Sequence, residues 1–421
     1  MRALWCELAW LGGDEPAAGV LVELGDDGRI ARLKAGVRPD SHAERLAGLT
    51  IPGLANAHSH AFQRALRGRA QGPGSFWTWR AEMLTLAETL DPDSYVGLAR
   101  ATYAEMALAG VTLVGEFHYL HHAPDGTPYA DPNAMGRALL QAAAAVGIRI
   151  VLLDACYLDG GIVRFRDASA EAWAARVSEL DGAGAAIHSV RAVDPAGAAI
   201  VARWATERGA PLHAHVSEQP AENLFAREHR GATPTELLDD AGAVGERFTA
   251  IHATHVSGHD VARLGGAGAT VCVCPTTERD LGDGIGIARL LADAGARLAL
   301  GSDSHAVIDL LEEARAMELD ERLASGERGR HGAASLLGAA TRGGYASLGL
   351  HDGGRLEAGA LADLATISLD SVRLAGVPAA GAVFCATAAD VRDVMVGGRW
   401  IVRDGAHVSL DVAAELRRAI A

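Results

Sequence analysis

The sequence is poor in positive charge. Lys34 is the only lysine among 421 residues, and the 38 lysine and arginine residues face 53 acidic ones, so the formal net charge is −15. A chain this acidic is unsuited to nucleic acid or an anionic membrane surface, because both repel it. An acidic small molecule would have to be held by a few local arginines rather than by the field of the whole protein.

Cysteine is also scarce, and its spacing argues against a thiolate metal site. The five cysteines are an odd number, and no two are separated by two residues. Cys272 and Cys274 alternate along an expected strand, where they would act as small core residues rather than disulfide partners. We therefore expect neither a disulfide framework nor a zinc site built from cysteine pairs.

Long apolar runs are missing as well. No basic and apolar segment of the kind that directs secretion is visible near the N-terminus, and the longest apolar runs have the length of strands. We expect a cytoplasmic location without a membrane partner. A hydrophobic content of 49% with 5% aromatic residues is ordinary for a soluble enzyme with a large core.

Short apolar runs alternate with alanine-rich stretches of helical period over most of the chain. A strand followed by a helix, repeated eight times within roughly 250–300 residues, predicts a (β/α)8 barrel of the TIM type, whose active site lies at the C-terminal ends of the strands. The expected strands are residues 49–55, 111–117, 148–156, 185–190, 211–216, 248–253, 269–274 and 297–301.

Both ends of the chain contain short strands without intervening helices. Strands are expected at residues 3–11, 19–24 and 29–33, and again at 362–368, 383–386 and 391–402, the last one interrupted by the Gly397-Gly398 turn. We expect an α/β protein in which the two ends combine into a small discontinuous β-sandwich domain. The predicted division is 1–48 and 356–421 for this domain and 49–355 for the barrel.

Histidines and one aspartate follow the predicted barrel strands. His58 and His60 are two residues apart at the end of the first strand, so their rings point the same way and can reach one ion. His-x-His also occurs by chance, but His215, His252 and Asp303 each end a strand of their own. Their convergence at one barrel face predicts a metal site. Imidazoles and a carboxylate suit tetrahedral Zn²⁺, with iron as the alternative.

Further polar residues end other strands and are expected at the same face. Strand two contributes three of them, strand four two, and strand five one, in this order: Glu116, His118, Tyr119, His188, Arg191 and Glu218.

Longer strings of residues resemble a known group. The chain resembles the amidohydrolase superfamily over nearly its whole length, and within it the formimidoylglutamate deiminase family. The superfamily likeness rests on the histidines and the aspartate after strands one, five, six and eight. The narrower likeness rests on residues 56–64 (NAHSHAFQR), 75–80 (SFWTWR), 116–122 (EFHYLHH), 188–191 (HSVR) and 280–284 (DLGDG).

The resemblance implies a zinc enzyme, commonly a homodimer, that converts N-formimino-L-glutamate and water to N-formyl-L-glutamate and ammonia in histidine degradation. It implies the metal ligands His58, His60, His215 and Asp303. Glu218 and His252 match the proton-handling pair, and Asp303 also takes part in catalysis. The positions that match substrate-binding residues are Gln63, Arg80, Tyr119, His188 and Arg191.

The lysine count bears on the number of metal ions. Superfamily members with two metals usually bridge them with a modified lysine from the barrel, and Lys34 lies outside the predicted barrel. One zinc ion per chain is therefore favoured.

Alternative roles remain open for four of these residues. Glu218 could orient a ligand histidine instead of carrying a proton. Arg80, between aromatic residues, could be a stacked surface arginine, and Gln63 and Tyr119 could be core hydrogen-bonding residues.

The function also keeps alternatives. One is a heterocycle deaminase of the guanine type, which would need aromatic stacking partners, for which Trp77, Trp79 and Tyr119 are the candidates. A non-catalytic scaffold is disfavoured because every expected ligand is present. The chain departs from the family in a short loop at residues 158–164 and in having Asp280 where the family has asparagine, which bears on substrate choice.

Overall fold

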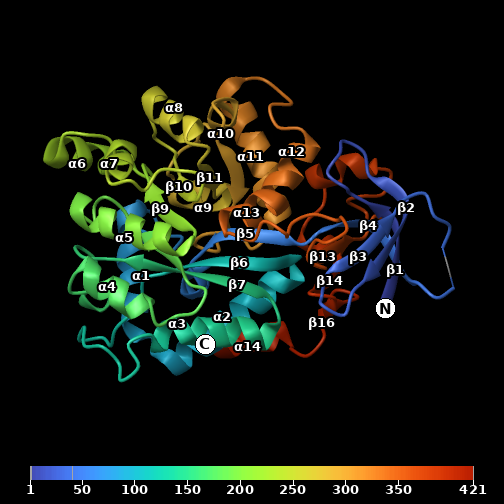
Figure 1. The fold of residues 1–421 in the computed structure, drawn as a ribbon, viewed down its shortest axis with the longest axis horizontal. Coiled ribbons are helices and arrows are strands. Elements are labelled where there is room, and N and C mark those ends of the chain that lie inside the picture. Colours follow the sequence, from blue (N-terminus) through green and yellow to red (C-terminus); the bar gives the residue numbers. More distant parts are fainter. Residues whose placement is uncertain (1, 40, 421) are drawn as a thin grey trace.

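The predicted fold class is confirmed by a computed structural model that describes residues 2–39 and 41–420. Eight parallel strands follow one another in chain order around a barrel, and helices cover their outer side (Figure 1). The barrel strands are β5 (Leu54–Ser59), β6 (Val111–His118), β7 (Arg149–Cys156), β8 (Gly184–Ile187), β9 (Leu212–Val216), β10 (Phe248–His252), β11 (Thr270–Val273) and β12 (Arg297–Leu300).

The connecting helices begin where the sequence places capping residues. Asp91 accepts a hydrogen bond from the backbone N–H of Ser94, and Asp194 accepts one from Gly197, each directly before a proline that opens the helix. The helices are α1 (Phe76–Thr89), α2 (Pro92–Leu108), α3 (Ala134–Val146), α4 (Ala170–Val177), α5 (Pro195–Arg208), α6 (Pro220–Arg230), α7 (Pro234–Asp240), α8 (Gly258–Gly266), α9 (Pro275–Leu281), α10 (Ala288–Asp293), α11 (Leu310–Ser325), α12 (Ala333–Gly338), α13 (Gly344–Ser347) and α14 (Val412–Ile420), with short helical turns η1 (Ala61–Leu66), η2 (Val163–Phe165), η3 (Ala339–Gly343), η4 (Ala379–Phe384) and η5 (Ala388–Asp390).

Backbone contacts between the first and last strands close the barrel just beyond their ends. Ser59 and Asp303 form a parallel bridge. The N–H of Asp303 donates to the carbonyl of His58 at 3.0 Å, and the N–H of His60 donates to the carbonyl of Asp303 at 3.1 Å. Residues far apart in the sequence are thereby fixed against each other by the main chain.

The two ends of the chain form a separate mixed sheet beside the barrel, blue and red in Figure 1. Its strand order is β16-β15-β14-β13-β4-β1-β2-β3, antiparallel except for the parallel pair β1 and β4. A core of its own includes Leu4, Val20, Ile30, Leu364 and Met395. The strands are β1 (Arg2–Ala9), β2 (Ala17–Leu24), β3 (Ile30–Lys34), β4 (Glu44–Pro52), β13 (Leu364–Ile367), β14 (Val391–Val396), β15 (Arg399–Arg403) and β16 (Ala406–His407).

Two strand predictions were wrong. The apolar run at residues 49–55 is the end of β4, which belongs to the small sheet, and the start of β5, the first barrel strand. β4 ends at Pro52 and Gly53 alone separates the two strands, packed so closely that a Cβ there would lie 2.1 Å from the hydroxyl of Thr112. Residues 383–386 overlap the helical turn η4 instead of forming a strand. The proposed domain limits stay a prediction.

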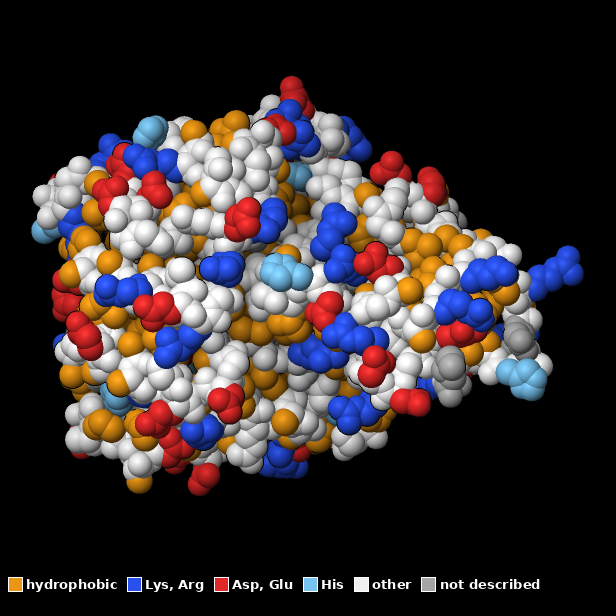
Figure 2. Space-filling model, in the orientation of Figure 1, with side chains coloured by type: hydrophobic (Ala, Val, Ile, Leu, Met, Phe, Trp, Pro, Cys, Tyr) orange, Lys and Arg blue, Asp and Glu red, His pale blue; other side chains and the backbone are white. Residues whose placement is uncertain are grey.

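The surface in Figure 2 carries acidic and basic side chains mixed together, without one broad basic area on that face. None of the described helices combines the length and the apolar character that crossing a membrane requires.

Candidate active site

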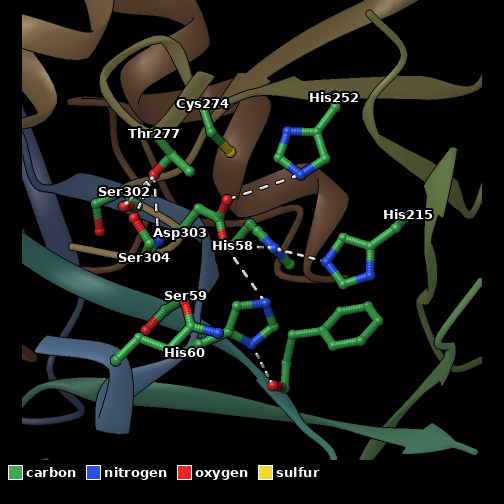
Figure 3. A network of polar contacts seen from close by, with 12 residues as sticks. His58, Ser59, His60, His215, His252, Cys274, Thr277, Ser302, Asp303 and Ser304 are labelled. Atoms are coloured by element: carbon green, nitrogen blue, oxygen red, sulfur yellow. Dashed lines mark hydrogen bonds and ion pairs between the residues drawn. The ribbon is translucent and has the colours of Figure 1, made fainter. Parts of the chain in front are cut away.

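Three histidines and one aspartate converge at the C-terminal ends of β5, β9 and β12 (Figure 3). The Nε2 atoms of His58 and His60 each lie 3.4 Å from Oδ1 of Asp303. Nε2 of His215 lies 3.2 Å from Nε2 of His58. The structure therefore brings together the four residues that the sequence predicted as metal ligands.

Backbone carbonyls determine which nitrogen of two of these rings carries the proton. Nδ1 of His60 donates to the carbonyl of Phe117 and Nδ1 of His215 donates to that of His188, both at 2.8 Å. Because a carbonyl can only accept, the proton lies on Nδ1 and the Nε2 lone pair faces the cluster. Burial lowers the pKa of His58 to about 3 and also lowers the pKa of His60 and His215. Neutral imidazoles and one carboxylate are a donor set that fits a divalent cation.

Backbone strain marks the same region. Asp303 has φ of 43° and His252 has φ of 67°, in the left-handed region that residues with a side chain rarely adopt. Such conformations cost about 1–3 kcal/mol each and persist where the surrounding structure enforces them. Burial alone would raise the pKa of Asp303, but His58, His252 and His60 hold it well below its usual value, so the carboxylate stays charged.

His252 lies beside this cluster and contacts three carboxylates. Its Nε2 is 3.7 Å from both Oε1 of Glu218 and Oδ2 of Asp303, and its Nδ1 donates to Oε1 of Glu278 at 3.2 Å. Burial lowers the pKa of His252, but the three carboxylates outweigh it and raise the pKa well above the ordinary value. Burial raises the pKa of Glu218. This histidine and the carboxylates around it can therefore hold and exchange protons at the site.

A pocket of about 440 Å³, including space open to solvent, leads to these side chains. All five residues predicted to bind substrate lie on its wall, together with members of the histidine cluster and several apolar residues. The lining residues are His60, Gln63, Phe76, Trp79, Arg80, Met83, Tyr119, His188, Arg191, His215, Glu218, Leu281 and Asp303.

Hydrogen bonds in the pocket bear on the alternative roles of Gln63, Tyr119 and Arg80. Gln63 donates from Nε2 to the hydroxyl of Tyr119 at 2.8 Å, so both take part in a buried hydrogen bond as well as lining the pocket. Arg80 projects from α1 and donates to the hydroxyl of Tyr157 at 3.4 Å, so it is not simply a stacked surface arginine. Nη2 of Arg191 lies 3.9 Å from Oε2 of Glu218, too far for a hydrogen bond.

Two residues predicted at this face lie elsewhere. Glu116 and His118 alternate with Phe117, on β6, and with Tyr119, which directly follows the strand, so they point out of the barrel. Glu116 accepts hydrogen bonds from the Ser59 hydroxyl at 2.6 Å and from the N–H of Ala61 at 2.7 Å, and thus supports the chain around His60 from behind. Burial raises the pKa of Glu116 to about 8.

Glu278 was not predicted from the sequence, and one aromatic residue was placed wrongly. Glu278 lies in α9, four residues after Cys274, and strand seven ends without a polar residue that would have drawn attention to it. Trp77 is 47% exposed and does not line the pocket, whereas Phe76 does. Asp280 accepts a hydrogen bond from Gln71 at 3.0 Å, and its neighbour Leu281 is the residue that reaches the pocket wall.

Residues 49–401 match the model of the amidohydrolase family. The chain belongs to this family. It is therefore a hydrolase, and the expected superfamily resemblance is confirmed. The donor set at the barrel face and the family together support a metal cofactor.

Two proteins of Pseudomonas aeruginosa illustrate the similarity at the sequence level. A formimidoylglutamate deiminase is 36% identical, covering 98% of this chain and 97% of its own length. An 8-oxoguanine deaminase is 32% identical, covering 96% and 94%.

Solved structures agree with the fold. An amidohydrolase from Brucella melitensis superimposes with a TM-score of 0.91 at 32% identity, covering 100% of this chain and 99% of its own. An atrazine chlorohydrolase from Arthrobacter aurescens, complexed with zinc, has a TM-score of 0.90 over the full length of both chains. At 22% identity, that second likeness concerns the fold alone.

Proposed function

We propose that this protein hydrolyses the C–N bond of a linear amidine, converting N-formimino-L-glutamate and water to N-formyl-L-glutamate and ammonia as a step of histidine degradation. The observation that carries the proposal is the pair Arg80 and Arg191 on the wall of a pocket that leads to His60, His215 and Asp303. A substrate with two carboxylates needs such cations in a chain whose overall charge is −15. The 36% identical deiminase supports the same assignment.

We assign one zinc ion per chain to His58, His60, His215 and Asp303, with iron as the alternative. Their converging acceptor atoms fit such an ion, and an ion there would lower the pKa of a water molecule so that hydroxide is available near neutral pH. We predict one tightly bound divalent metal per chain. Elemental analysis that found two equivalents, both required for activity, would contradict this prediction.

Proton transfer falls to three side chains in this proposal. Asp303 takes up the proton of the attacking water, and His252 holds the resulting hydroxide through a hydrogen bond from Nε2. Attack at the formimino carbon gives a tetrahedral species with two nitrogen substituents, and ammonia leaves once its nitrogen is protonated. Glu218, whose pKa burial raises, delivers that proton.

The substrate's glutamate moiety is assigned to the outer part of the pocket. Arg191 and Arg80 bind its carboxylates, and Gln63, Tyr119 and His188 complete the binding surface. Arg191 lies 3.9 Å from Glu218, so a carboxylate bound to Arg191 also brings the amidine close to the proton donor. Homodimer formation is proposed from the family resemblance, and the cytoplasmic location expected from the sequence is proposed with it.

A heterocycle deaminase is the second candidate, because the 8-oxoguanine deaminase of Pseudomonas aeruginosa is 32% identical and Phe76, Trp79 and Tyr119 line the pocket. Ammonia release should be measured with N-formimino-L-glutamate, N-formimino-L-aspartate, guanine, 8-oxoguanine and cytosine. We expect the highest kcat/KM with formimino-glutamate. A higher value for any of the ring compounds would overturn the proposal in favour of the second candidate.

A further inference from the structure

The two oxygens of the Asp303 carboxylate face different partners. Oδ1 lies 3.4 Å from the Nε2 atoms of His58 and His60, whereas Oδ2 lies 3.7 Å from Nε2 of His252. Figure 3 shows His252 on the opposite side of Asp303 from His60. A carboxylate in this arrangement can bind one cation with each oxygen.

Cys274 completes a second group of metal-binding atoms on the His252 side. Its sulfur, a ring nitrogen of His252 and a carboxylate oxygen of Asp303 all lie within 4.8 Å of one another, and all three residues are buried. Zinc bonds of about 2.0 Å to nitrogen or oxygen and 2.3 Å to sulfur imply ligand separations of roughly 3.3–3.7 Å in a tetrahedral site. Small side-chain movements would bring these atoms to that spacing.

The His252 ring is held ready for such a cation. Nδ1 donates to Glu278, so Nε2 is the nitrogen that can bind a cation, with the lone pair it gains when it gives up its own proton. Nε2 has no hydrogen-bond partner, although the residue is 1% exposed. The surrounding groups are Glu218, Glu278 and Asp303, whose charges attract a cation.

We propose that His252, Cys274 and Oδ2 of Asp303 form a second, weaker site for a soft divalent cation, such as zinc in excess or cadmium, and that its occupation inhibits the enzyme. Thiolate sulfur selects such cations. On binding, the Cys274 thiol and Nε2 of His252 each release one proton to solvent, and the sulfur and the nitrogen form bonds to the metal. This inference rests on the proposed function, because Asp303 must also serve the first ion.

The two ions would share one carboxylate and repel each other, so the second must bind more weakly than the first. Inhibition follows because the second ion occupies Nε2 of His252, the atom assigned to hold the hydroxide, and an oxygen of Asp303, the residue assigned to take up the proton of the attacking water. The lack of a barrel lysine excludes the usual lysine bridge between two metals, but it leaves this carboxylate bridge available.

Cadmium titration of enzyme that holds one equivalent of zinc tests the proposal. The Cys385→Ser background removes the one cysteine that is not buried, and therefore a source of unrelated cadmium binding. We expect an ultraviolet thiolate-to-cadmium absorption band that saturates at one further equivalent, with turnover falling in parallel. X-ray absorption should then find one sulfur bound to the added cadmium.

Cys274→Ser in the same background should keep the zinc ion and basal turnover but lose the absorption band. Its inhibition constant for cadmium should rise at least about 10-fold, the lower end of the effect that groups around a metal site have on affinity. Cys272→Ser is the matched control, because Cys272 lies two residues earlier, on β11, and is equally buried. It should retain both the band and the inhibition.

Inhibition by cadmium without a thiolate band, or a band that persists in Cys274→Ser, would overturn the proposal. If Cys274→Ser does not fold, the titration and X-ray absorption of the Cys385→Ser protein decide alone. Failure to retain even the first equivalent of zinc is a different result, because it contradicts the metal centre of the proposed function and with it the second site.

Discussion

Glu278 offers a sharp test of how the site works, because it touches His252 without facing the pocket. Its Oε1 accepts from Nδ1 of His252 at 3.2 Å and from the N–H of Cys274 at 3.0 Å. We predict that Glu278→Ala lowers kcat by releasing the imidazole from its orientation and from its proton assignment. KM for the acidic substrate should change little, because Glu278 is not on the pocket wall.

The magnitude follows from the bond that is lost. Glu278 is 5% exposed, and a hydrogen bond to a charged group contributes about 1.5–3 kcal/mol. If all of this free energy stabilises the transition state, losing the hydrogen bond lowers kcat by about 10- to 150-fold. The N–H of Cys274 also loses its acceptor, so Glu278→Ala should cost about 1–3 kcal/mol of folding stability. Glu278→Gln keeps an acceptor oxygen, so its kcat and its folding stability should both fall less than those of Glu278→Ala.

The assay is steady-state ammonia release over a range of pH, with unfolding measured in parallel. Glu278 raises the pKa of His252, so Glu278→Gln should shift the limb of the pH profile that reports His252 to lower pH. Glu313→Gln is the control, since Glu313 is equally buried and accepts from the N–H of Thr276 without contacting His252. Wild-type kcat and an unshifted profile in both Glu278 variants would refute the reasoning.

Three further predictions concern proton delivery, substrate binding and stability. Glu218→Gln should lower turnover at least about 10²-fold with metal content unchanged, whereas loss of metal would support an orienting role instead. Arg191→Met and Arg80→Met should each weaken kcat/KM for the acidic substrate by about 1.5–3 kcal/mol, and unchanged values would mean that the carboxylates bind elsewhere. Asp154 is fully buried, and although burial would raise its pKa, Arg176 at 2.9 Å lowers it to about 2. Asp154→Asn should therefore be less stable than wild type above about pH 4, with the difference disappearing as pH falls to about 2, and a pH-independent difference would contradict the pairing.

Much of the fold could be predicted because the barrel strands are apolar on both faces and are separated by helices with clear capping residues. Seven expected strands overlap the observed ones, from Val111–His118 to Arg297–Leu300. The first strand was misjudged because residues 49–52 and 54–55 form one apolar run, and hydrophobicity alone does not tell which of two sheets a strand joins. Pro52 and Gly53 were the local sign of the break, and their meaning depends on contacts with Asp363 and Thr112.

Those site residues that lie at the ends of barrel strands could be predicted from the sequence. His215, His252 and Asp303 needed only the rule that polar residues at these ends meet. Glu116 and His118 satisfied the same rule and point the other way, because which alternate residues face inward depends on a register that the sequence does not reveal. Glu278 reaches His252 from a helix turn, so no strand pattern could identify it.

The geometry of the predicted ligands depends on backbone contacts more than on side-chain pairing. The main chain joins His58 and His60 to Asp303 where the barrel closes, and carbonyl groups orient the rings of His60 and His215. Such contacts do not change when pocket side chains change. The pocket wall, in contrast, is drawn from α1 and from segments that follow several different strands. Substitutions there can alter the substrate without disturbing the ligand cluster, which is why relatives named as deaminases of different compounds can share one fold.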